Sequence, residues 1–163
     1  MTMAVKKRFP YRAALVACSG GCRATAACEY GCVACGICAG VCRFGAIEIN
    51  ALGVAEVDED KCIACGVCVR ECPRGVIHIH DCANPVVVKC SNHDPGKNAR
   101  KYCSVSCIGC GLCAKACPAG AIEVQNNLAV IDESTCLSCG QCAVKCPRGA
   151  LRDLRGILTA KNA

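Results

Sequence analysis

The stretch CIACGVCVRECPRGVIHI, residues 62–79, contains the pattern that decides the fold of this 163-residue chain. Four cysteines follow one another with the spacing C-x2-C-x2-C-x3-C, and a Pro-Arg-Gly turn then leads into a short apolar run. The same cysteine spacing occurs in four places, and each copy is followed by a similar glycine-containing tail. The motifs are Cys32, Cys35, Cys38, Cys42; Cys62, Cys65, Cys68, Cys72; Cys107, Cys110, Cys113, Cys117; and Cys136, Cys139, Cys142, Cys146.

Four thiolates at this spacing are typical ligands of a [4Fe–4S] cluster of the bacterial ferredoxin type. Soft sulfur ligands suit iron, and two-residue gaps let three sulfurs of one tight loop approach three corners of a cube. In this motif the fourth cysteine ligates the neighbouring cluster. We therefore predict four [4Fe–4S] clusters with crossed ligand sets: Cys32, Cys35, Cys38 with Cys72; Cys62, Cys65, Cys68 with Cys42; Cys107, Cys110, Cys113 with Cys146; and Cys136, Cys139, Cys142 with Cys117.

Zinc sites and disulfides fit the cysteine pattern poorly. Zinc sites typically use two well-separated C-x2-C pairs, often with histidine, and disulfides need an oxidising compartment. Cysteine makes up 22 of 163 residues, whereas aromatic residues are 3% and tryptophan is absent. An ordinary apolar core is therefore thin, and we expect the clusters and their loops to replace much of it.

The formal charge of +6 does not indicate a nucleic-acid partner. An oxidised [4Fe–4S] core with four thiolates carries about −2, so four of them bring the whole protein to about −2. No run approaches 18 apolar residues, so the sequence predicts no membrane span.

Residues 1–27 form a basic N-terminal segment, for which we expect a solvated tail; a docking patch for an acidic partner is the alternative. Its basic residues are Lys6, Lys7, Arg8 and Arg12. The run from Leu15 to Cys18 resembles a lipoprotein cleavage site, but Pro10 and Arg12 interrupt the apolar stretch before it. That stretch is shorter than the roughly seven residues of a signal core, so we predict a cytoplasmic protein.

The repeats predict an α+β fold of two tandem bacterial-type 2[4Fe–4S] ferredoxin-like modules, small and low in regular structure. We assign the first module to residues 28–81, a linker to 82–102, the second module to 103–152 and a C-terminal tail to 153–163. Alternating runs predict one hairpin in each module, turning at Gly53 and at Asn126-Asn127. The segments between third and fourth cysteines predict short helices.

Three of the four motifs are followed by proline, namely Pro73, Pro118 and Pro147. Arg43 occupies this position in the first motif, so we expect that loop to be the least regular. The linker contains one strand candidate, residues 86–89. Histidine ligates clusters rarely outside Rieske-type centres, so we interpret His78 and His80 as strand residues.

Six cysteines lie outside the motifs: Cys18, Cys22, Cys28, Cys82, Cys90 and Cys103. Cys28 and Cys103 each lie four positions before the first motif cysteine of their module. This symmetry favours a structural role as buried thiols, which behave as small apolar residues. The alternative is a fifth cluster on Cys18, Cys22, Cys28 and one of the others, although these spacings match no standard ligand run.

Several stretches resemble the cluster-bearing part of the B subunit of the Rnf electron-transport complex. They are ALVACSGGC (residues 14–22), CEYGC (28–32), the run from VVVKCSNHDPGK to LAVID (86–132) and CLSCGQCAVKCPRGAL (136–151). The resemblance covers roughly residues 13–151 and implies a relay between reduced ferredoxin and a flavin- or nicotinamide-linked partner. The membrane helix that begins the B subunit of that family has no counterpart here, and Cys35 fills a position that many such subunits leave without cysteine. We therefore expect a soluble, Rnf-like polyferredoxin and do not carry over ion pumping.

Two classes of function follow. We favour an electron-transfer subunit that relays single electrons through four clusters, between a low-potential donor such as ferredoxin and a partner oxidoreductase. Such a subunit has no activity alone and works in a hetero-oligomeric complex with ferredoxin, a flavoprotein or a metalloenzyme subunit. The alternative is a redox enzyme with substrate or a fifth cluster bound at the extra cysteines. No nucleotide-binding glycine loop or catalytic triad is evident, and we expect the clusters to leave little room for a pocket.

Overall fold

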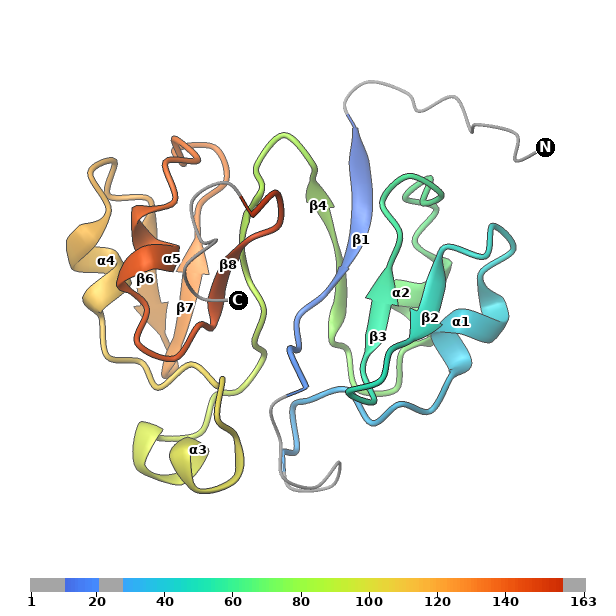
Figure 1. Ribbon diagram of the computed structural model, residues 1–163, viewed down its shortest axis with the longest axis horizontal. Helices are drawn as coiled ribbons and strands as arrows, with labels where there is room; N and C mark the ends of the chain where they lie inside the picture. Colours follow the sequence, from blue (N-terminus) through green and yellow to red (C-terminus); the bar gives the residue numbers. More distant parts are fainter. Residues whose placement is uncertain (1–10, 21–27, 157–163) are drawn as a thin grey trace.

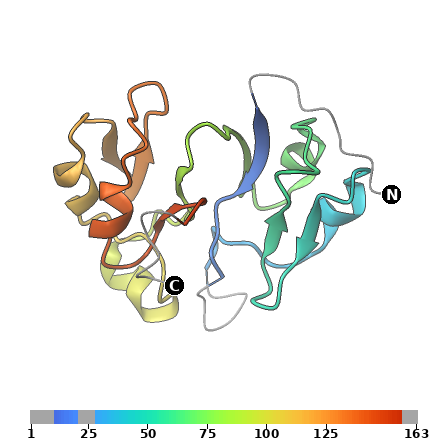
Figure 2. The same ribbon diagram turned by 45° about the horizontal axis from the view of Figure 1, so that its top comes forward.

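The computed structural model describes residues 11–20 and 28–156, and within them the chain forms two lobes (Figure 1). The first lobe, coloured blue to green, contains β1 to β4, and the second, coloured yellow to red, contains α4, α5 and β6 to β8. After a rotation of 45° the lobes remain distinct, and β1 and β4 still lie on the side of the first lobe that faces the second (Figure 2). The arrangement confirms a small chain with few and short regular elements.

The first module is built from two antiparallel strand pairs and two short helices. Strand β1 (Arg12–Val16) pairs with β4 (Ile77–Asp81), and β2 (Ile47–Ile49) pairs with β3 (Ala55–Val57). Helix α1 (Ile37–Val41) packs against α2 (Val67–Glu71). The predicted hairpin around Gly53 is therefore confirmed, and the predicted short helices form, each beginning one residue before the third cysteine.

The second module repeats this arrangement. Strand β5 (Val86–Val88) pairs antiparallel with β8 (Leu151–Asp153), and β6 (Ile122–Gln125) pairs with β7 (Leu128–Ile131). Helix α4 (Leu112–Ala116) packs against α5 (Gln141–Lys145). Asn126 and Asn127 have positive φ angles of 47° and 65°, as the predicted two-residue turn requires.

Strand β1 was not predicted, since the sequence indicated a solvated tail where Arg12–Val16 forms a buried strand. A short apolar run of small residues does not reveal from sequence whether it has a partner, and here the partner is β4, more than sixty positions away. Strand β5 likewise pairs with β8 of the second module, although it lies in the predicted linker. Each module thus begins with a strand before its first motif. Lys6, Lys7 and Arg8 lie outside the described residues.

The four cysteine loops share one backbone conformation. The residue after the second cysteine is a glycine with φ between 73° and 77°, and it precedes a helix of five residues in every copy. The residue before the second cysteine also has positive φ, from 51° at Ser138 to 63° at Gly109. Arg43 does not make the first loop irregular, because Cys42 has the same extended conformation as its counterparts.

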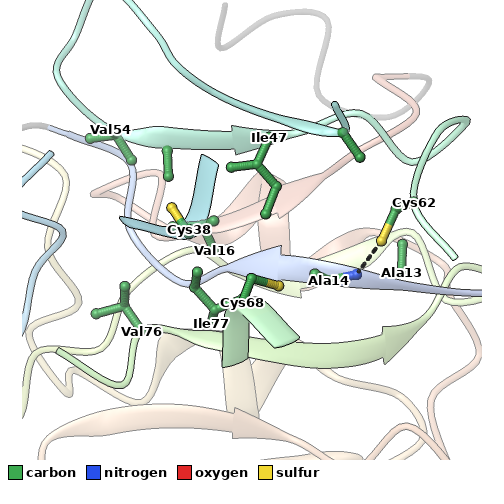
Figure 3. Close-up of a cluster of buried hydrophobic side chains, with 12 residues drawn as sticks. Ala13, Ala14, Val16, Cys38, Ile47, Val54, Cys62, Cys68, Val76 and Ile77 are labelled. Carbon is green, nitrogen blue, oxygen red and sulfur yellow. Dashed lines mark hydrogen bonds between the residues drawn. The ribbon is translucent and has the colours of Figure 1, made fainter. Parts of the chain in front are cut away.

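Each module has its own apolar core, to which cysteines contribute heavily, and Figure 3 shows the core of the first module. In the first module Cys38, Cys62 and Cys68 are buried among Val16 and Ile77, with their sulfurs inside the lobe. In the second, Cys107, Cys113 and Cys142 take the same place. The cysteine side chains that would bind a cluster are therefore also part of the apolar core of each module.

The predicted linker is folded around a buried asparagine. Asn92 is 1% exposed and donates from Nδ2 to the Tyr102 hydroxyl at 2.8 Å, and that hydroxyl donates in turn to Asp94. Burial and the bond to Asp94 raise the pKa of Tyr102. These bonds attach the last residue of helix α3 (Gly96–Tyr102) to the segment before the helix. Cys103 follows directly after the helix.

Candidate metal centres

The first module contains two cavities, and each is lined by four motif cysteines. One is lined by Cys32, Cys35, Cys38 and Cys72 together with Pro73. The other is lined by Cys62, Cys65, Cys68 and Cys42. They contain about 330 Å³ of space each, open mouth included. In both cavities the fourth cysteine comes from the neighbouring motif.

The second module repeats this exchange of cysteines. A cavity of about 310 Å³ on the same measure is lined by Cys107, Cys110, Cys113 and Cys146. Burial raises the pKa of Cys142 most, and Cys136, Cys113 and Cys117 are near enough for their charges to raise it further. Cys117 is the cysteine of the neighbouring motif that the predicted fourth quartet requires.

Backbone N–H groups point at several of these sulfurs. Ala46 and Ala121 each donate to the fourth cysteine of the preceding motif, Cys42 at 3.4 Å and Cys117 at 3.3 Å. Ala64 and Ser138 each donate at 3.4 Å to the first cysteine of their motif, Cys62 and Cys136. Such bonds stabilise a thiolate and raise the reduction potential of a cluster that it holds.

Within each motif the third cysteine is buried and the second is exposed. Burial raises the pKa of Cys38, Cys68 and Cys113, and raises that of Cys142 to about 11. These thiols are therefore neutral without metal and lose their protons when they bind one. The second cysteines lie at the surface, so each site has one face close to solvent.

The sulfurs of each quartet are spaced too widely for a single zinc ion. Tetrahedral zinc with Zn–S distances of about 2.3 Å brings its sulfurs to about 3.8 Å from one another. Among described residues, only Glu59, His80 and Cys82 place three possible ligand atoms within 4.8 Å of one another. In none of the quartets do three sulfurs lie this close together, and a cluster holds its cysteine sulfurs farther apart than a zinc ion does. His78 and His80 lie in β4 as predicted.

Substitution of Gly109 by alanine would test how closely the second module packs around one of its cysteine loops. A Cβ at Gly109 would lie 3.0 Å from Cα and 3.1 Å from the carbonyl oxygen of Asn127, whereas a Cβ at Gly111 meets nothing within 4 Å. Both glycines have positive φ, so alanine costs about 1–2 kcal/mol at either. We expect Gly109→Ala to cost roughly 1–3 kcal/mol more, because the β6–β7 turn must move.

The measurement is the melting temperature of the anaerobic holoprotein, with its iron content as a check on loading. Gly111→Ala is the matched control, since it introduces the same methyl group and the same strain in the same loop. Equal melting temperatures for the two variants would contradict the close approach to Asn127.

The cysteines outside the motifs fall into two groups. Cys18, Cys28, Cys90 and Cys103 line one cavity together, whereas Cys82 lies beside His80 and Glu59. Cys28 and Cys103 are buried, as the symmetry of the sequence predicted. Cys22 lies outside the described residues. The spacing alone did not reveal the first group, because its members come from both modules.

A larger cavity lies between the modules, contrary to the expectation that the clusters would leave little room for a pocket. It contains about 970 Å³ on the same measure and is lined mainly by apolar side chains from β5 and β7, with His78, His93 and Glu133 among them. His93 Nδ1 lies 3.0 Å from the Asn126 carbonyl oxygen, to which it donates in the tautomer that is protonated there. Cys90 and Ser91 also line this cavity, and the Ser91 hydroxyl donates to the Ala17 carbonyl oxygen.

Two protein-family descriptions match the chain. Residues 106–150 match the 4Fe-4S dicluster domain, and residues 55–78 match the 4Fe-4S binding domain. The first match spans both motifs of the second module, and the second spans the motif around Cys62 to Cys72. The chain is thus a ferredoxin-type iron–sulfur protein of electron transport.

Two relatives extend this similarity. The B subunit of the Na(+)-translocating ferredoxin:NAD(+) oxidoreductase complex of Acetobacterium woodii is 45% identical over 121 residues, which are 74% of this chain and 35% of that subunit. The B subunit of the proton-translocating ferredoxin:NAD(+) oxidoreductase complex of Clostridium ljungdahlii is 50% identical over 108 residues, which are 66% of this chain and 38% of that subunit. The chain resembles the cluster-bearing part of the Rnf B subunit. This Rnf B-like chain spans little more than a third of the length of these relatives.

A solved assembly shows a weaker likeness. A chain of the formate dehydrogenase–heterodisulfide reductase–formylmethanofuran dehydrogenase complex of Methanospirillum hungatei matches 77% of the Rnf B-like chain and 51% of its own length. It does so at 22% identity with a TM-score of 0.30, which is too low to support an inference. Among the described residues, no helix has the length and apolar character needed to cross a membrane.

Proposed function

We propose that this protein relays single electrons through four [4Fe–4S] clusters, one at each crossed cysteine quartet. The donor is a low-potential carrier such as reduced ferredoxin, and the acceptor is a partner oxidoreductase in a larger complex. This is the arrangement that the names of the two relatives suggest. We place its site of action in the reducing cytoplasm, where cysteine thiols remain available as cluster ligands.

The observation that carries the proposal is the exchange of the fourth cysteine between neighbouring motifs. Cys72 lines the cavity of the first motif, and Cys42 lines that of the second. Helices α1 and α2, which carry the third cysteines, pack against one another. Two clusters held in this way lie close together, as transfer of electrons between them requires.

The exposure of the cysteines suggests where electrons enter and leave. Cys35, Cys65, Cys110 and Cys139 are the exposed cysteines, one in each motif. Apolar side chains beside them are also exposed, including Ile37, Ile63, Leu112 and Leu137. A redox partner that docks on such a patch would approach the adjacent cluster closely and exclude water from the contact.

The isolated holoprotein should accept electrons and perform no chemistry on organic substrates. Under anaerobic conditions, reduced ferredoxin or dithionite should bleach its visible absorbance. NAD(+) should not be reduced at an enzyme-like rate, because no nucleotide-binding glycine loop is present in the sequence. The measurements are stopped-flow absorbance for cluster reduction and the near-ultraviolet absorbance of NADH for its formation.

The control adds a flavoprotein partner, which carries the site where NAD(+) is reduced. With ferredoxin and that partner present, addition of the holoprotein should increase the rate of NADH formation. Steady NADH formation by the holoprotein without a partner would refute a pure relay and support the alternative of a redox enzyme.

A further inference from the structure

We propose that Cys18, Cys28, Cys90 and Cys103 hold a fifth [4Fe–4S] cluster, which lies between the two modules and connects them. The inference deepens the proposed relay and rests on it. None of these cysteines belongs to a C-x2-C-x2-C-x3-C motif, and together they line one cavity. That cavity contains about 290 Å³, similar to the 310–330 Å³ of the motif cavities.

The four cysteines are two pairs related by the repeat. Cys18 follows β1 and Cys90 follows β5, at the same distance from the strand end. The backbone N–H of Ala17 donates to the Val76 carbonyl at 2.8 Å, and that of Lys89 donates to the Ala150 carbonyl at 2.8 Å. Each strand pair thus extends to the residue directly before its cysteine, which fixes where the cysteine lies.

The two segments also bind one another reciprocally. The Ser19 hydroxyl donates to the Lys89 carbonyl at 3.1 Å, and the Ser91 hydroxyl donates to the Ala17 carbonyl at 2.7 Å. These bonds connect residues 70 and 74 positions apart. They hold the segments that carry Cys18 and Cys90 together, and both cysteines line the same cavity.

The second pair is held by equivalent arginines. Arg74 Nη2 donates to the Cys28 carbonyl at 2.8 Å, and Arg148 Nη2 donates to the Cys103 carbonyl. Each arginine follows the proline after the last motif cysteine of its module. Lys89 lines this cavity, and the two guanidinium groups line the adjoining motif cavities, so positive charge nearby offsets the negative charge of four thiolates and a cluster core.

The contacts around the sulfurs match those of a cluster site. Cys90 Sγ accepts from the backbone N–H groups of Asn92 at 3.4 Å and Cys107 at 3.3 Å. A Cβ at Gly31 would lie 3.5 Å from Cys28 Sγ and 3.6 Å from Cys18 Sγ, so glycine leaves room beside both sulfurs. No three of the four sulfurs come within 4.8 Å of one another, which is wider than zinc requires.

A buried hydroxyl without a protein partner also lines the cavity. Ser106 is 2% exposed, and its Oγ has no hydrogen-bond partner among the described residues. An unsatisfied buried hydroxyl is costly, and a cluster sulfur would accept its proton. A neutral thiol sulfur is only a weak acceptor for this hydroxyl, whereas cluster sulfides and thiolates carry negative charge and accept more strongly.

The location explains what the fifth cluster does. Cys28 and Cys103 lie four residues before Cys32 and Cys107, so the cavity adjoins one proposed cluster of each module. The Cys107 amide donates to Cys90, which connects the two sites directly. Electrons that enter one module can then pass through this cluster to the other.

The test counts clusters in the anaerobic holoprotein by native mass spectrometry together with iron and sulfide analysis. We expect about twenty iron and twenty sulfide per chain, and about sixteen of each in the Cys18→Ala/Cys90→Ala variant. Cys82→Ala is the matched control, because Cys82 is outside the motifs and outside this cavity, and should keep about twenty. The Cys103→Ser variant provides a second, milder disruption.

The outcomes separate this inference from the proposed function. About sixteen iron in the wild type, unchanged in the double variant, would overturn the fifth cluster and leave the relay standing. Stoichiometric zinc lost on mutation would also overturn it. A chain with little iron would overturn both. If the double variant does not fold, the iron content of the wild type and of the Cys103→Ser variant decides whether a fifth cluster is present.

A kinetic measurement tests the connecting role. In the wild type, reduced ferredoxin should bleach all clusters in one phase. Without the fifth cluster we expect two phases, with about half of the bleaching at least about tenfold slower. A single phase at the wild-type rate in the variant would overturn the connecting role.

Discussion

Removal of iron and sulfide from the holoprotein is expected to unfold both modules. The cores depend on cysteine, with Cys38, Cys62 and Cys68 in the first and Cys107, Cys113 and Cys142 in the second. The strands, three to five residues long, form only two-stranded sheets, which are marginally stable on their own. A domain has only about 5–15 kcal/mol of net stability, and metal binding supplies a comparable amount in small metal-bound domains.

Amide hydrogen exchange and far-UV circular dichroism would measure this loss under anaerobic conditions. Protection of amides in β1 and β4 should fall to the level of an unfolded chain after treatment with an iron chelator and acid. Holoprotein exposed to chelator already saturated with metal is the control. An apoprotein that kept native protection and a cooperative melt would show that the apolar side chains suffice.

Pairs of substitutions should reveal crossed ligation through their failure to add. Cys35→Ala and Cys72→Ala should each remove about four iron, and the two together should still remove about four, because they damage one cluster. Cys65→Ala with Cys72→Ala should remove about eight, because Cys65 lines the other cavity. If each motif instead held its own cluster, these two results would be exchanged.

The second module provides the matched control. The Cys110→Ala/Cys146→Ala variant should lose one cluster, and the Cys139→Ala/Cys146→Ala variant should lose two. Iron analysis and low-temperature EPR of the reduced protein would count the remaining clusters. In every variant of one module the clusters of the other should persist, since each module has a separate core.

Local sequence predicted the parts of the structure that local chemistry determines. The cysteine spacing predicted the loops and their short helices, and the structure adds a glycine of positive φ before each helix, at Gly36, Gly66, Gly111 and Gly140. The Asn126-Asn127 turn followed from the ability of asparagine to take positive φ. The effect of Arg43 was overestimated, because the loop conformation depends on the glycines and on the helix that follows.

The sequence by itself determined the kind of protein, because the ligand spacing, the turns and the resemblance to the Rnf B subunit are all carried by short stretches. Only the tertiary structure decided how distant residues meet. It turned residues 12–16 into a strand of the first module and brought Cys18 and Cys28 to Cys90 and Cys103. These cysteines have no ligand spacing along the chain, since the pairing of β1 with β4 and of β5 with β8 is what positions them.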